Sequence, residues 1–113
     1  MHELSIAQNI IDIVKAEMIN YDAKILRAVH LRIGAMSSIM PDSLSFCFEA
    51  IISGTELEGA TLIIETIPLK GCCKGCNGNF EIVDYMFRCP LCNSHDITIV
   101  AGRELAVAAI EVD

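Results

Sequence analysis

Four cysteines in the second half of the chain have the spacing of a metal site. They form two CxxC pairs, at residues 73–76 (CKGC) and 89–92 (CPLC), with twelve residues between the pairs. Each CxxC turn can direct two thiolates at one ion, and two such turns supply the four sulfur ligands of a closed tetrahedral site. The sequence therefore predicts zinc bound by Cys73, Cys76, Cys89 and Cys92.

The residues around the two pairs fit tight metal-binding turns. Asn77 and Asn93 each follow the second cysteine of a pair directly, where a left-handed backbone is often needed and asparagine tolerates it. The intervening residues 80–87 are expected to form a hairpin that returns the chain. Structural zinc contributes about 10–16 kcal/mol in small peptides, which is enough to fold a segment that has few aliphatic residues.

Two questions about this motif stay open. Cys72 adjoins Cys73, and only Cys73 leaves two residues before Cys76, so we predict Cys73 as the first ligand and Cys72 as a spare thiol. The pairs could instead be redox-active dithiols or hold iron. An iron site of the rubredoxin type needs a tighter aromatic shell than the three aromatic residues of this segment provide, so zinc is favoured.

A second set of metal donors stands at the start of the chain, Met1-His2-Glu3. The Met1 α-amine, the His2 main-chain amide and the His2 imidazole can close a five- and a six-membered chelate ring on one ion, with Glu3 as a fourth donor. A large residue at position 2 blocks removal of the initiator methionine, so the amine is expected to belong to Met1. Planar, nitrogen-rich coordination suits Ni(II) or Cu(II) better than Zn(II). The alternative is a frayed, functionless terminus.

The rest of the sequence predicts the elements that must position these donors. Apolar residues at helical spacing predict a helix over residues 6–19, with Ser5 as its N-cap. A second helix is expected to begin at Pro41 and to bury Cys47 on its apolar face. Strands are predicted at residues 24–33, 60–67, 97–100 and 105–112. The last strand is apolar on both faces, which predicts a central or doubly covered strand.

Together these elements predict an α+β fold. We expect a small mixed three-stranded sheet with two helices, plus an inserted four-cysteine module like a zinc ribbon. Residues 1–69 and 99–113 would form the nickel-binding α/β domain, and residues 70–98 the zinc-binding module.

Composition excludes several classes of function. The chain has 113 residues, 53% of them hydrophobic, and a net charge of −7, which argues against nucleic-acid binding and against a membrane surface. The N-terminus has no basic residue before Lys15 and does not resemble a secretory signal, so a cytoplasmic location with reduced thiols is expected. No nucleophile with a base and no phosphate-binding loop is apparent, so an enzyme is not predicted.

Three stretches of the sequence resemble the hydrogenase maturation nickel metallochaperones: MHELSI at the start, CPLC in the second cysteine pair and GRELAVAAIEVD at the end. The resemblance spans essentially the whole chain. It implies a nickel site at the N-terminus that uses His2, with Glu3 involved, and a separate structural zinc site at the four paired cysteines. It also implies work with a nickel-handling GTPase and the hydrogenase large subunit as recipient, with urease maturation factors as further clients in some relatives.

The remaining expectations concern one histidine, the oligomeric state and two competing functions. His95 lies three residues after Cys92 and is a candidate accessory ligand, with an exposed loop histidine as the alternative. A homodimer is one option that the sequence leaves open. A zinc-ribbon module for protein or nucleic-acid binding fits the cysteines but not the acidic charge. A CxxC redox protein would need thiols that oxidise without unfolding the chain.

Overall fold

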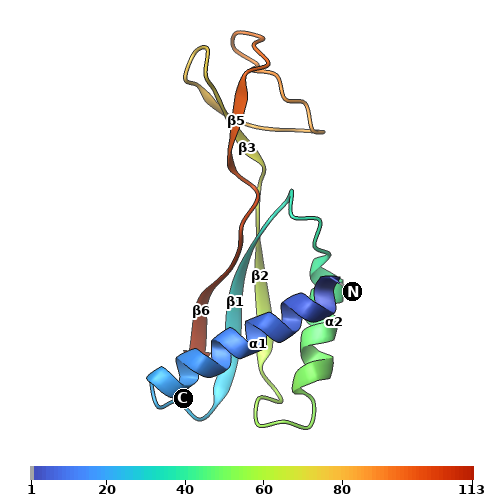
Figure 1. The fold of residues 1–113 in the computed structure, drawn as a ribbon, viewed down its shortest axis with the longest axis vertical. Coiled ribbons are helices and arrows are strands. Elements are labelled where there is room, and N and C mark those ends of the chain that lie inside the picture. Colours follow the sequence, from blue (N-terminus) through green and yellow to red (C-terminus); the bar gives the residue numbers. More distant parts are fainter. Residues whose placement is uncertain (1) are drawn as a thin grey trace. The chain divides into compact units, whose positions relative to one another are not determined.

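The structure is a computed structural model that describes residues 2–113, apart from the side chain of His2. Its elements, in chain order, are α1 (His2–Asn20), β1 (Leu26–Gly34), α2 (Pro41–Ile52), β2 (Thr61–Ile67), β3 (Lys70–Cys73), β4 (Asn79–Glu81), β5 (Ile97–Ala101) and β6 (Leu105–Val112) (Figure 1). None of the helices within residues 2–113 is both long enough and apolar enough to cross a membrane.

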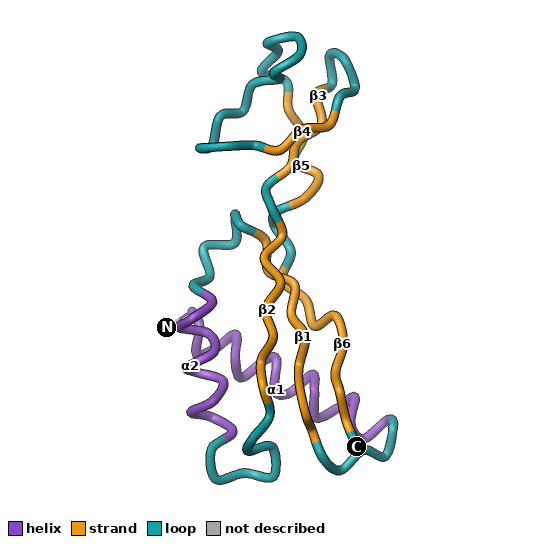
Figure 2. Tube along the Cα trace, turned by 180° about the vertical axis from the view of Figure 1, so that it is seen from behind, coloured by secondary structure: helices purple, strands orange, loops and turns teal. Residues whose placement is uncertain are grey.

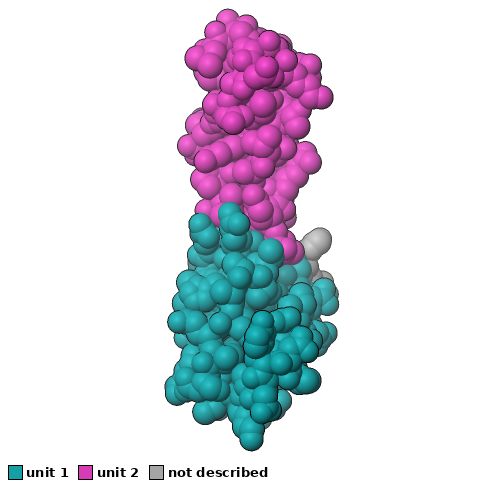
Figure 3. Space-filling model, turned by 90° about the vertical axis from the view of Figure 1, so that its left-hand side faces the viewer, with its two compact units in different colours: residues 1–32, 39–65, 106–113 teal, residues 33–38, 66–105 magenta. Residues whose placement is uncertain are grey.

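The chain divides into two compact units (Figure 3). Unit 1 comprises the chain up to residue 32, residues 39–65 and residues 106–113, and unit 2 comprises residues 33–38 and 66–105. The predicted fold class is confirmed, with two helices, small mixed sheets and a four-cysteine cluster. The assignment of separate nickel and zinc domains stays a prediction, because compactness does not show which residues carry function.

The sheet with strand order β2-β1-β6 underlies unit 1. β1 and β2 run in the same direction and are joined through α2, a crossover that parallel strands require (Figure 1). β6 runs antiparallel to β1, and the Asp113 N–H donates to the Ile25 carbonyl at 3.0 Å. Helix α1 crosses one face of this sheet, whereas neither helix covers the opposite face (Figures 1 and 2).

The core of unit 1 lies between the helices and the sheet. Helix α1 buries one stripe of residues at helical spacing: Ala7, Ile10, Ile11, Val14 and Met18. Helix α2 buries Leu44, Phe48 and Ile52, four residues apart. Cys47 lies at the margin of that stripe and is half-buried, rather than buried as predicted.

Helix α1 begins at His2, so the prediction that Ser5 caps a helix starting at residue 6 is wrong. Glu3 and Leu4 are good helix formers, and an acidic residue in the first turn is favourable at the positive end of the helix dipole. These local preferences extend the helix by a full turn beyond the serine. The chain's first residues are therefore helical from position 2 onward.

β6 is an edge strand, so the prediction of a central or doubly covered strand is wrong. The central strand is β1, and every residue of β6 is at least partly exposed. The prediction from hydropathy failed because three of the eight residues of β6 are alanines, which are apolar but too small to bury much surface.

A second sheet, in the order β4-β3-β5, underlies unit 2. β3 pairs antiparallel with both neighbours, and Cys72 lies opposite Asn79 on one side and Thr98 on the other. The hairpin expected over residues 80–87 does not form, because β4 pairs back onto β3 instead. The segment after β4 is a loop with a tight turn, in which the Met86 N–H donates to the Val83 carbonyl at 3.1 Å.

Candidate metal centre

Four cysteine sulfurs lie together in unit 2. The Sγ atoms of Cys73, Cys76, Cys89 and Cys92 are all within 4.8 Å of one another. Cys73 Sγ lies 3.5 Å from Cys92 Sγ, and Cys76 Sγ lies 3.6 Å from Cys89 Sγ. Zinc–sulfur bonds of about 2.3 Å in a tetrahedron place the sulfurs about 3.8 Å apart. The donor set and its spacing therefore fit a zinc ion without rearrangement of the backbone.

The first cysteine turn is closed by two main-chain hydrogen bonds. The Cys73 carbonyl accepts from the Asn77 N–H at 2.7 Å, and the Cys73 N–H donates to the Gly78 carbonyl at 2.9 Å. A Cβ atom at Gly78 would lie 3.1 Å from Leu91 Cδ1 and 3.4 Å from the Cys76 sulfur, so the glycine keeps the space between the two cysteine turns uncrowded. Cys73 is also the last residue of β3, which anchors the turn to the sheet.

The second turn repeats this pattern without a strand to support it. The Cys89 carbonyl accepts from the Asn93 N–H, and the Cys89 N–H donates to the Ser94 carbonyl, both at 2.9 Å. Asn93 and Asn77 have φ of 62° and 61°, so the predicted left-handed asparagines are confirmed. The Leu91 N–H also points at the Cys89 sulfur at 3.4 Å. Local hydrogen bonds therefore pre-shape both turns for a shared ion.

Burial differs within each pair in the same way. Cys73 and Cys89, the first cysteines, are fully buried, whereas Cys76 and Cys92 are exposed. The cluster thus lies at the surface of unit 2, with two thiols facing inward and two facing solvent. Such a closed set of four sulfurs leaves no position for a substrate, which is typical of a structural site.

Hydrogen bonds from main-chain N–H groups and from neighbouring thiols give the cysteines of the cluster different pKa values. The Cys76 main-chain N–H donates a hydrogen bond to the Cys73 sulfur. This bond stabilises the Cys73 thiolate by more than desolvation destabilises it, and it lowers the pKa of Cys73 to about 7. The Ser94 N–H lowers the pKa of Cys92, but the neighbouring Cys73 thiol, desolvation and the other two thiols together outweigh it and raise that pKa to about 12. The metal-free cluster therefore holds several protons at neutral pH, which an incoming metal must displace.

We expect zinc affinity to fall steeply as the pH falls. Zinc binds thiolates, and below pH 7 even Cys73, whose pKa is lowered to about 7, becomes protonated. Displacing two or more protons per ion weakens binding by at least about a hundredfold per pH unit. Competition with a coloured chelator between about pH 5.5 and 7.5 measures this slope. An affinity that stays constant over that range would contradict the four-thiolate site.

The other two candidate donors of this unit stand apart from the cluster. Cys72 is half-buried on β3, and its thiol donates a hydrogen bond to the Cys73 carbonyl at 3.9 Å. Alternation along the strand turns its side chain away from that of Cys73. His95 is exposed, and it joins no group of metal donors among the residues that the structure describes. Geometry thus brings together the four paired cysteines and neither of these two.

The N-terminal donors fall largely outside the described residues. Met1 and the His2 side chain are not described, so the chelate that the sequence predicts there stays a prediction. The backbone of His2 begins α1, and Glu3 is half-buried in the first turn of that helix. The main-chain nitrogens of these residues therefore occupy the helix N-terminus.

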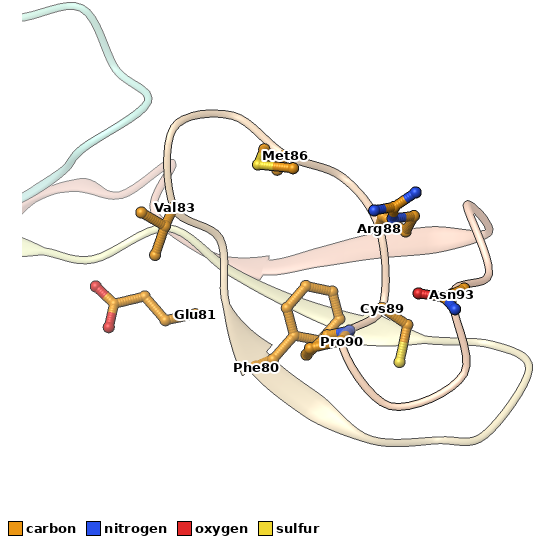
Figure 4. Close-up of a pocket in the computed structure, with 8 residues that line it drawn as sticks. All are labelled: Phe80, Glu81, Val83, Met86, Arg88, Cys89, Pro90 and Asn93. Atoms are coloured by element: carbon orange, nitrogen blue, oxygen red, sulfur yellow. The ribbon is translucent and has the colours of Figure 1, made fainter.

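A pocket that no sequence signal indicated opens beside the cluster. It has a volume of about 310 Å³, and Cys89 forms part of its wall (Figure 4). Phe80 and Pro90 supply apolar lining, while Glu81 and Arg88 supply charge. Its residues come from β4, the following loop and the second cysteine turn, so only the folded arrangement of unit 2 reveals it.

Comparison with known sequences agrees with this arrangement. The family model described as "Hydrogenase/urease nickel incorporation, metallochaperone, hypA" matches residues 1–112. The hydrogenase maturation factor HypA of Geobacter metallireducens is 39% identical over 113 residues, which is 100% of both chains. That of Chloroflexus aurantiacus is 43% identical over 112 residues, or 98% of each chain.

Comparison with solved structures supports the fold. A solution structure of a HypA protein has a TM-score of 0.75 at 23% identity and covers 99% of this chain and 96% of its own. The solution structure of the Ni metallochaperone HypA from Helicobacter pylori has a TM-score of 0.69 at 21% identity, covering 97% and 96%. With a family match over almost every residue and full-length relatives near 40% identity, the chain belongs to the HypA family of hydrogenase and urease nickel-incorporation metallochaperones.

Proposed function

We propose that the chain binds Ni(II) at its N-terminus and delivers it for [NiFe] hydrogenase maturation, while zinc at the four cysteines holds unit 2 in shape. The observation that carries the nickel part is that α1 begins at His2. A chelate built from the Met1 amine and His2 must use main-chain amide nitrogens. Whether those amides are already committed to helical hydrogen bonds therefore decides whether the chelate is compatible with the fold.

The first turn of a helix leaves these amides available. The first four N–H groups of a helix have no intrahelical acceptor, so a metal can replace the His2 amide proton without breaking a helical hydrogen bond. The positive end of the helix dipole also favours the anionic amide nitrogen that results. Nickel would then sit at an open helix end, where a recipient can exchange donors one at a time.

The two metal sites differ in a way that suits two tasks. The cysteine cluster is closed by four sulfurs and fixed by main-chain hydrogen bonds, which suits a permanent structural ion. The N-terminal set is short and has few fixed ligands, which suits a transported ion. We also propose that the chain is a cytoplasmic, non-enzymatic carrier. It would work with a nickel-handling GTPase and the hydrogenase large subunit, and urease maturation factors would be further partners.

Replacing His2 by alanine tests the nickel site. Zinc-loaded protein without a tag should lose at least about a hundredfold in nickel affinity, because the imidazole closes the six-membered chelate ring. Calorimetric titration with Ni(II) measures this, and the zinc content should stay at one ion per chain. His30→Gln is the matched control, because His30 lies on β1 and contacts Glu111 Oε2 at 3.0 Å. Unchanged nickel affinity in His2→Ala would contradict the proposal.

Two further variants define the ligand set. An added Gly-Ser at the N-terminus turns the Met1 amine into an amide and should weaken nickel binding to a similar extent. His95→Ala should leave nickel binding unchanged if His95 is only an exposed loop residue, and should weaken it if His95 is an accessory ligand. Full nickel affinity in the extended protein would show that the terminal amine is not a ligand.

A further inference from the structure

The first cysteine turn contains the only asparagine in the sequence that a glycine follows, Asn77-Gly78. Asparagine before glycine is prone to deamidation, in which the next main-chain nitrogen attacks the side-chain carbonyl. Glycine favours this attack because it has no Cβ to hinder its own nitrogen or to restrict its backbone. Asn93 holds the equivalent place in the second turn, but Ser94 follows it. The two turns are therefore a matched pair in which one has the reactive sequence.

The backbone of the folded turn opposes the reaction. Asn77 has φ of 61°, in the left-handed region. Ring closure requires the Asn77 Cβ and the Gly78 nitrogen to be eclipsed about the Cα–C bond, whereas the ψ that accompanies the left-handed region turns them nearly opposite. The Asn77 N–H donates to the Cys73 carbonyl at 2.7 Å, and the Gly78 carbonyl accepts from the Cys73 N–H at 2.9 Å. These two hydrogen bonds hold both sides of the bond that would have to rotate.

The attacking nitrogen is also held by the cysteine cluster. The Gly78 N–H donates a hydrogen bond to the Cys76 sulfur. When zinc is bound this sulfur is a thiolate, which accepts the hydrogen bond more strongly than a thiol and keeps the proton on the nitrogen. Asn77 itself is exposed, so water and solvent bases can reach its side chain. Access is therefore no obstacle, and the shape of the turn is what prevents the reaction.

We propose that Asn77-Gly78 is a deamidation site that bound zinc protects and that loss of zinc exposes. The inference rests on the structural zinc proposed above. When the turn opens, the Gly78 nitrogen loses its proton to a solvent base and forms a bond to Asn77 Cγ, while the bond from Cγ to the side-chain nitrogen breaks and ammonia leaves. Water then opens the ring, giving aspartate by attack at Cγ and isoaspartate by attack at the main-chain carbonyl.

The reaction makes the loss of zinc hard to reverse. Isoaspartate inserts a carbon atom, its Cβ, into the main chain before Gly78, so the two hydrogen bonds that close the turn on Cys73 lose their register. Aspartate instead adds a negative charge beside four thiolates, whose charge already exceeds that of one zinc ion. Both products should therefore bind zinc more weakly than the original chain, and they record that a chain has been without zinc.

Peptide mass spectrometry after timed incubation under reducing conditions tests the proposal. Trypsin cuts after Lys74, Arg88 and Arg103, so the two turns fall in separate peptides, residues 75–88 with Asn77 and residues 89–103 with Asn93. Zinc at about 100 times its Kd lowers the population of the open turn about a hundredfold, so chelator-treated protein should deamidate at Asn77 about a hundredfold faster than zinc-loaded protein. Asn93 should react far more slowly than Asn77 in the chelator-treated sample.

Two variants separate the protection from the reactive sequence. Cys73→Ser removes one zinc ligand, so its Asn77 should react at the fast rate with or without added zinc. Gly78→Ala keeps Asn77 but should slow the reaction in chelator-treated protein, because its methyl group hinders the attacking nitrogen. In the folded turn that Cβ would lie 3.1 Å from Leu91 Cδ1, the end of an exposed side chain that can rotate away.

Three results would overturn the inference. One is an equal rate at Asn77 in the zinc-loaded and chelator-treated samples when metal analysis shows one zinc per loaded chain. Another is a reaction at Asn93, or at Asn77 of Gly78→Ala, as fast as that at Asn77 of the wild type. The third is wild-type zinc affinity in fully deamidated protein. A protein that takes up no zinc would overturn the structural zinc site itself, so metal analysis distinguishes that failure from the other three.

Discussion

Cys73→Ser is expected to abolish tight zinc binding and to unfold most of unit 2. Zinc in a four-thiolate site contributes about 10–16 kcal/mol to the folding of small metal-binding peptides. Outside the cluster, unit 2 buries few large side chains, chiefly Ile33, Ile67, Leu69 and Ile82. So small a core does not offset the conformational entropy of the loops that carry the cysteines. Zinc analysis and amide NMR spectra measure both effects.

Unit 1 should behave differently in the same variant. Its core, which includes Phe48, Leu44 and Val14, is fully buried and contains none of the paired cysteines. Amide signals from α1, α2 and the strand segments in unit 1 should therefore stay dispersed, while those of residues 70–98 collapse toward random-coil positions. Loss of all dispersed signals would show instead that the zinc ion also sustains the fold of unit 1.

Cys72→Ser is the matched control for this experiment. It removes the neighbouring thiol on the same strand, but Cys72 lies outside the cluster, and its thiol donates a hydrogen bond to the Cys73 carbonyl. Zinc content and amide signals should match the wild type. If Cys72→Ser loses zinc and Cys73→Ser keeps it, the first ligand has been assigned to the wrong residue.

The cysteine cluster was predictable from the sequence because its geometry is local. A CxxC turn spans four residues, and the asparagine after each pair adopts the left-handed conformation that its side chain tolerates. Which of Cys72 and Cys73 joins the cluster depends on the direction of the side chain along β3, and the spacing to Cys76 indicated that direction. The spacing and backbone preferences of neighbouring residues were therefore enough to predict this part of the site.

The elements that the sequence missed depend on distant partners or on size. β4 pairs with β3, which lies earlier in the chain, rather than with the residues that follow β4, and no local pattern reveals that choice. β6 looked central because hydropathy counts alanine as apolar without weighing its small area. The pocket beside Cys89 requires three separate segments to meet. The strand pairing and the pocket depend on contacts between segments that are separate in the sequence, so local patterns do not predict them.

Gly34→Ala is expected to destabilise the protein by at least about 3 kcal/mol. A methyl group at Gly34 would lie 2.1 Å from both the carbonyl carbon and the carbonyl oxygen of Gly102. Both obstructing atoms belong to the main chain, so no side chain can rotate to make room. The Gly34 N–H also donates to the Glu104 carbonyl at 2.7 Å, and separating the two segments would break that hydrogen bond.

Thermal unfolding of the zinc-loaded protein measures this cost. A loss of about 3 kcal/mol should lower Tm by more than about 10 °C in a chain of this size. Gly54→Ala is the control, because Gly54 has φ of 78° but no atom within 4 Å of an added methyl group. Its backbone strain alone should cost about 1–2 kcal/mol. An equal loss of stability in the two variants would mean that the segments at Gly34 and Gly102 can separate freely. A larger loss in Gly34→Ala would show that the close contact between these segments stabilises this part of unit 2.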